Sequence, residues 1–137
     1  MSIQAVAGLD LEDTFVLAWH RTPDTLTIHM LASLLPEHPE FSAPSEADWS
    51  CYRPGLIQFF GVSSVQGLLP QASVPAATDS AGEVDYGCID QLLLAGPGRY
   101  TLSGEFGNVS LAAEVLVVVL APRPNNSSKP TPLRGAA

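Results

Sequence analysis

The three histidines are the side chains of this chain best suited to binding a transition metal. His20 and His29 fall on two predicted strands that pair around the turn 21–24. Strand alternation then places both imidazoles on one face, two residue pairs apart. Two imidazoles beside a carboxylate can bind zinc, but no Cys or Glu lies at ligand spacing. We expect two solvent-facing strand residues, and we keep a metal-dependent or hydrolytic enzyme that uses this His20/His29 face as an alternative.

Two long segments, 36–54 and 70–86, carry the residues that we expect to bind a partner. Both are rich in proline, which cannot donate to a strand ladder, so we predict loops. The acidic residues of the second loop and its flank lack the fixed spacing of a calcium-binding loop. We therefore predict no metal or other cofactor there. The candidate binding residues of the two loops are Glu37, His38, Glu40, Trp49, Asp79, Glu83 and Asp85.

Motifs for nucleophilic or nucleotide chemistry are absent from the sequence. It contains no G-x-S-x-G, no P-loop, no G-x-G-x-x-G after a strand and no C-x-x-C. Its two cysteines, Cys51 and Cys88, are isolated, which is typical of small buried hydrophobic residues in a reducing compartment. We predict a protein without catalytic residues.

The negative net charge of the chain limits the class of partner that it can bind. The net charge is −8, and all fourteen acidic residues lie between Asp10 and Glu114. Only three arginines accompany them before Pro122, so that part has a net charge of −11. Such a surface repels nucleic acid and anionic membranes, which bind clustered Lys and Arg. We expect a basic protein partner, with the alternative that the charge only keeps the protein in solution.

The ends of the chain suggest its location and domain limits. The first residues, MSIQAVAGLDLED, have neither the basic nor the long apolar region of a signal peptide, and no run of 18 apolar residues occurs. We therefore expect a cytoplasmic protein. Its length of 137 residues suggests one domain. We place this β-sandwich domain at 1–121, and we predict that the proline-rich tail 122–137 is disordered.

The segment Tyr100 to Leu120 shows the fold class most clearly. We interpret it as a hairpin whose two-residue turn is Gly107-Asn108, because glycine tolerates the positive φ of such turns. Both arms alternate between apolar and polar residues with the same parity about this turn. The run 116–120 is apolar at every position, which is typical of a covered strand at the centre of a sheet.

The other strands are predicted at 14–20, 25–34, 56–62, 65–69 and 88–94. The first two form a hairpin around Pro23, with Phe15, Leu17 and Trp19 on the apolar face. The turn Gly96-Pro97-Gly98 pairs 88–94 with the strand that begins near Tyr100, which makes a meander. The fold class is therefore all-β, a single-domain antiparallel β-sandwich or flattened barrel of about seven strands.

Four segments resemble a group of small bacterial β-rich proteins of unknown function. They read LEDTFVLAWHRTPDTLTIHMLASLLPEHP, CYRPGLIQFFGV, VDYGCIDQL and GEFGNVSL. Some similar domains accompany toxins as immunity proteins, so the resemblance implies a binding role and transfers no catalytic residue. We predict a non-catalytic acidic protein-binding module, with an immunity protein as one form of it. A structural subunit that forms homodimers through a sheet edge is a further alternative.

Overall fold

The computed structural model describes residues 3–43, 51–78 and 82–122. Three short 3₁₀ helices occur in these ranges: η1 (Gln4–Val6), η2 (Leu11–Asp13) and η3 (Gln71–Ser73). The strands are β1 (Phe15–Arg21), β2 (Thr25–Leu34), β3 (Cys51–Phe60), β4 (Ser64–Gln66), β5 (Ala77–Thr78), β6 (Val84–Asp85), β7 (Ile89–Gly96), β8 (Arg99–Gly104), β9 (Gly107–Ala112) and β10 (Val115–Leu120). The all-β prediction is confirmed, whereas the predicted number of about seven strands was too low. Within the same ranges, no helix has the length and apolar character needed to cross a bilayer.

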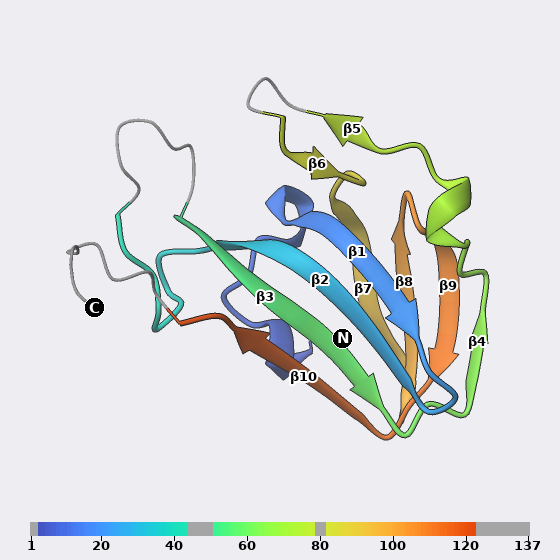
Figure 1. Ribbon diagram of the computed structural model, residues 1–137. Helices are drawn as coiled ribbons and strands as arrows, with labels where there is room; N and C mark the ends of the chain where they lie inside the picture. Colours follow the sequence, from blue (N-terminus) through green and yellow to red (C-terminus); the bar gives the residue numbers. More distant parts are fainter. Residues whose placement is uncertain (1–2, 44–50, 79–81, 123–137) are drawn as a thin grey trace, which may run out of the picture.

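Two four-stranded antiparallel sheets form a sandwich (Figure 1). One sheet has the order β1-β2-β3-β10 and the other β4-β9-β8-β7, while β5 and β6 form a small separate ribbon. The sandwich was one of the two predicted forms.

The core lies between the two sheets. In β2 every second side chain from Leu26 to Leu34 is buried, as the sequence TLTIHMLASL predicts for a strand with one face on a core. Ile57 and Phe59 continue this face on β3, and Leu102 and Leu111 approach it from the other sheet. Apolar burial of this kind contributes about 25 cal/mol per Å² to folding.

The C-terminal meander is confirmed with one correction, which concerns its second turn. Leu94 pairs with Tyr100 and Leu92 with Leu102, as predicted. However, Gly104 pairs with Gly107, so the turn consists of Glu105-Phe106 rather than Gly107-Asn108. Because the turn moves by two residues, each side chain stays on its predicted face of the sheet, and the predicted apolar face is correct. The turn moved because Phe106 is buried in the core, with an exposed fraction of 1%.

The apolar strand β10 is an edge strand, which contradicts its predicted position at the centre of a sheet. After Ala113 the chain leaves the β7-β8-β9 sheet, and β10 pairs with β3 in the other one. Val115 and Val119 are 48% and 47% exposed. A continuous apolar run thus belongs here to an edge strand that pairs with β3 alone among the described strands, with Val115 and Val119 exposed and η1 in contact with it.

The first hairpin has the predicted turn but a bulged first strand. Val16 pairs with Met30 and Ala18 with His29, so Leu17 is an extra residue. The bulge turns Val16 and Trp19 into the core and leaves Leu17 37% exposed. The predicted inward position of Trp19 is confirmed, whereas the predicted inward positions of Phe15 and Leu17 were wrong.

The two predicted loops contain more regular structure than expected. β3 begins at Cys51 and includes Pro54, although the missing N–H of this proline predicted a loop. Its carbonyl accepts from the Ala121 N–H at 2.8 Å, at the point where β10 ends, so the missing donor faces no strand. The second predicted loop contains η3, β5 and β6.

The outer edge of β1 is covered by segments that follow β4 and β6 in the chain. The Val16 N–H donates to the Gly87 carbonyl at 2.8 Å, and the Trp19 N–H donates to Gln71 Oε1 at 2.8 Å. The Trp19 indole also donates to the Leu69 carbonyl at 2.9 Å. Segments 69–74 and 86–89 therefore close this side of the sandwich.

Candidate functional site

The strand register collects acidic residues at one end of the sandwich. Leu34 pairs with Cys51 and also bridges to Leu9, while Phe15 bridges to Cys88. Ile89 pairs with Gly104, so the turn after β8 belongs to the same end. We call this region the acidic end, and its described carboxylates are Asp10, Glu12, Asp13, Glu37, Glu40, Glu83, Asp85, Asp90 and Glu105.

The opposite end of the sandwich is nearly neutral. The Val62 N–H donates to the Asp24 carbonyl at 2.9 Å, and Arg99 pairs with Ala112 directly before the crossover to β10. The charged residues at this end are Arg21, Asp24, Arg99 and Glu114. The protein is thus electrically polarised along its strands.

Cys88 lies among the carboxylates of the acidic end. Burial raises the pKa of its thiol, and the negative charges of Asp13, Asp85, Asp90 and Asp10 raise it further. A raised pKa keeps the thiol protonated at neutral pH, which is the opposite of what a nucleophilic cysteine requires. Cys88 therefore indicates a dense negative field rather than a catalytic centre.

Two of these carboxylates have a structural role. Asp13 accepts hydrogen bonds from the Ser33 hydroxyl and the Tyr52 hydroxyl, each at 3.0 Å. Asp85 accepts from the Gly87 N–H at 2.8 Å, a local turn that sets the start of β7. These contacts hold the backbone of the acidic end in place and leave its net charge negative.

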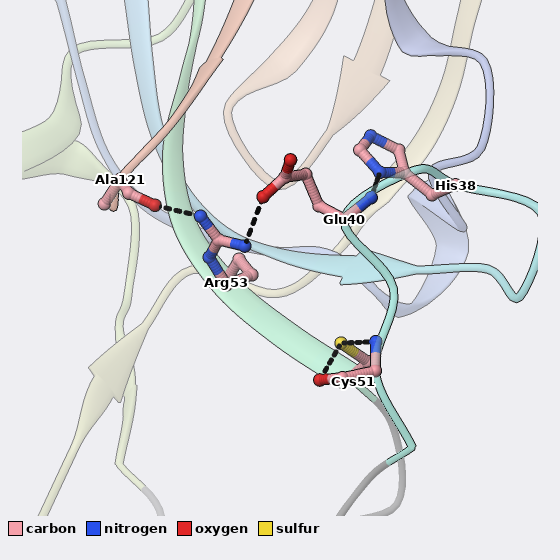
Figure 2. A network of polar contacts seen from close by, with 6 residues as sticks. His38, Glu40, Cys51, Arg53 and Ala121 are labelled. Atoms are coloured by element: carbon pink, nitrogen blue, oxygen red, sulfur yellow. Dashed lines mark hydrogen bonds and ion pairs between the residues drawn. The ribbon is translucent and has the colours of Figure 1, made fainter. Parts of the chain in front are cut away.

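A buried arginine connects three segments beside the acidic end (Figure 2). Arg53 is 6% exposed, and its guanidinium forms an ion pair with Glu40 at 3.2 Å and donates to the Ala121 carbonyl. The His38 Nδ1 accepts from the Glu40 N–H at 2.9 Å, which shapes the connection after β2. Arg53 is the only described basic side chain of this region, and Glu40 offsets its charge.

An open cavity of about 540 Å³ lies beside this network. It is lined by Gln4, Ala5, Ala7, Gly8, Glu37, His38, Pro39 and Glu40. The His38 ring lies so close to Gly8 that a Cβ there would come within 2.9 Å of its Cδ2. The N-terminal segment and the loop after β2 are therefore in direct contact.

His20 and His29 lie away from this end, on the outer face of the β1-β2 hairpin. Their Nε2 atoms are 3.2 Å apart, with ring centroids 4.9 Å apart and planes inclined by 69°. The prediction that they share a face is confirmed. Among the described residues, no third His, Cys, Asp or Glu joins them, so the set falls short of the three protein ligands of a catalytic zinc site.

The predicted binding residues divide into three groups. Glu37, His38 and Glu40 lie together at the cavity, and Glu83 and Asp85 lie on or beside β6 at the same end. Trp49 and Asp79 fall outside the described residues.

Sequence reasoning missed four carboxylates of the acidic end: Asp10, Glu12, Asp13 and Glu105. They lie outside the two long acidic segments, whereas Asp90 flanks the second of them. Their position beside strand ends was the available indication.

Comparison of the chain with family models, with curated proteins and with solved structures finds no match. The resemblance noted in the sequence therefore stays a prediction.

Proposed function

We propose that this protein is a non-catalytic binding module whose acidic end binds a basic protein surface. The observation that carries the proposal is the segregation of charge along the strands: nine described carboxylates and Arg53 at one end, two of each sign at the other. A field of one sign on one end accelerates association with an oppositely charged partner and orients it.

The shape of the acidic end favours a protein partner over a small ligand. Its carboxylates come from η2, the loop after β2, β6, the start of β7 and the β8-β9 turn, so they cover a broad surface. Several of them, including Glu12, Asp90 and Glu105, are exposed to solvent, and hydrogen bonds hold the backbone of this end in place. An ordered array of this kind loses little entropy when it meets lysine and arginine side chains. An immunity protein that neutralises a basic toxin is one form of this function.

Two variants with the same net charge test this proposal. Asp90→Asn/Glu105→Gln removes two exposed charges from the acidic end, and Asp24→Asn/Glu114→Gln removes two from the opposite end. Exposed charge pairs contribute about 0.2–1 kcal/mol each, so we expect roughly 5-fold weaker binding of a captured basic protein by the first variant only. Capture from lysate at 50 and 500 mM salt, followed by titration of the captured protein, measures this. Equal loss in both variants, or capture that salt leaves unchanged, would contradict a role for the acidic end.

Self-association through β10 is the second candidate function. In the described residues nothing pairs with the outer edge of β10, and its sequence VLVVVL has no charge, proline or bulge to protect that edge. The adjoining outer face is uncharged as well: Leu56, Gln58, Phe60, Val115, Val117 and Val119. An antiparallel strand pair is self-complementary about a two-fold axis, so a second copy can extend the sheet. Because a dimer of this kind would be formed through uncharged strands, the acidic ends of the two copies would stay out of the interface.

Lysine substitution separates an edge contact from a general apolar effect. We expect Val119→Lys to abolish a dimer, because lysine on an edge strand opposes pairing. Leu93→Lys is the matched control, since Leu93 is 43% exposed on β7 and Val119 is 47% exposed. Light scattering at about 10 and 300 μM should show a dimer mass for the wild type and for Leu93→Lys, and a monomer mass for Val119→Lys. A monomer mass for the wild type at both concentrations would exclude this candidate.

A further inference from the structure

We propose that His20 and His29 form a binding site for a divalent transition-metal ion of the zinc type. This site is separate from the acidic end and independent of the function proposed above. The argument rests on the geometry of the two imidazoles, on the bulge that creates it and on the uncharged face around it.

The β-bulge in β1 brings the two imidazoles together. Phe15 pairs with Leu31, and continuing that register would set His20 opposite Leu26, whose side chain is buried in the core. The extra residue Leu17 shifts the register, so that His20 pairs with Thr27 on the outer face. His29 is two residues further along β2, at the diagonal distance that ring side chains can bridge. A bulge that redirects a side chain in this way is common beside functional sites.

The separation of the two Nε2 atoms matches the geometry of a zinc site. Zinc binds imidazole nitrogen at about 2.0–2.1 Å, and two ligands of a tetrahedron at that distance are about 3.3–3.4 Å apart. The Nε2 atoms of His20 and His29 are 3.2 Å apart. An ion can therefore bind both nitrogens with a small rotation of the rings. Without metal, a hydrogen bond between the same two nitrogens maintains the arrangement.

The surroundings suit a cation with open coordination positions. His20 is exposed, so water or a donor from another molecule can complete the coordination sphere. Thr27 and Gln58 lie on the same face, and the Gln58 amide donates to the Thr27 hydroxyl at 3.5 Å. No lysine or arginine shares the outward positions of β2, β3 or β10, and the net charge of −8 attracts cations.

Zinc titration of the untagged, full-length protein tests the site. At pH 7.5, calorimetry should show one Zn²⁺ bound per chain, and ZnCl₂ should raise the melting temperature. Two linked ligands gain about 100-fold over one, so His20→Asn and His29→Asn should each weaken binding by roughly that factor. His38→Asn is the control, because His38 lies at the cavity beside Gly8 and leaves the pair intact. Cu²⁺ should bind more tightly than Zn²⁺, and excess CaCl₂ should not compete.

Circular dichroism completes the test. Far-UV spectra check that the variants fold. If His29→Asn does not fold, His20→Asn still tests the site, because His20 is exposed. The proposal is overturned if the wild type binds no Zn²⁺ or if binding survives both substitutions. Competition by CaCl₂ would also overturn it, since it would assign the ion to the carboxylates.

Discussion

Gly67→Ala should lower the free energy of unfolding by roughly 3 kcal/mol, the sum of backbone strain and a steric clash. Gly67 has a φ of +91°, a conformation that residues with a Cβ rarely adopt. A Cβ there would also overlap the backbone carbonyl oxygen of Asn108. Because that oxygen is part of β9, relief requires β4 and the segment after it to move away. Denaturation followed by far-UV circular dichroism measures the loss.

Two other glycines show whether this explanation is correct. Gly107→Ala should be comparably harmful, because φ is +123° there and a Cβ would overlap the Gly67 carbonyl oxygen. Gly96→Ala should stay within about 1 kcal/mol of the wild type and favour stability, since its surroundings are open and alanine reduces the entropy of the unfolded chain. Equal effects of Gly67→Ala and Gly96→Ala would show that the close approach between β4 and β9 is not tight.

Trp19→Ala should lower the free energy of unfolding by about 4 kcal/mol, the usual range for removing a buried aromatic side chain. Trp19 is 5% exposed, and its ring contacts those of Tyr86 and Phe106 at centroid distances of 5.1 and 5.9 Å. It joins the β1 edge to the segments that close that side of the sandwich. Denaturant unfolding followed by far-UV circular dichroism is the suitable measurement, because the substitution itself changes the fluorescence.

Trp19→Phe separates packing from hydrogen bonding. It keeps an aromatic ring but leaves the Leu69 carbonyl without its indole donor, at a cost of about 1–3 kcal/mol. Leu17→Ala, on the same strand but 37% exposed, should cost less than about 1 kcal/mol. If Trp19→Phe were as harmful as Trp19→Ala, the ring contacts would contribute little and the hydrogen bond would dominate.

Short-range patterns predicted the parts of the fold that depend on alternation. The inward set of β2, from Leu26 to Leu34, follows from period two alone. The pairing of Leu92 with Leu102 was predicted from a three-residue turn, and the structure reaches it with the two-residue turn Pro97-Gly98 and a register shift between Leu94 and Gly96. In both cases neighbouring strands are joined by a short turn, so the register depends on residues that are close in sequence.

The errors occur where residues distant in sequence compete with a local pattern. Gly107 was the better turn residue by propensity, but burial of Phe106 moved the turn by two residues. The bulge at Leu17 depends on Trp19 meeting the rings of Tyr86 and Phe106. The free energy of a turn preference is small compared with that of burying an aromatic side chain, so core packing determined the positions of the turn and the bulge.

The sequence by itself determined that the protein is all-β, which residues of most strands are apolar and that the chain is strongly acidic. These properties depend on composition and on alternation over a few residues. The tertiary structure alone decided that β10 forms an edge, that carboxylates from five separate segments gather at one end and that the two imidazoles are in contact. The physical reason is that sheet membership depends on which distant strands bury each other's apolar faces. Which strands pair therefore depends on the apolar burial summed over the whole core, and no single segment contains that information.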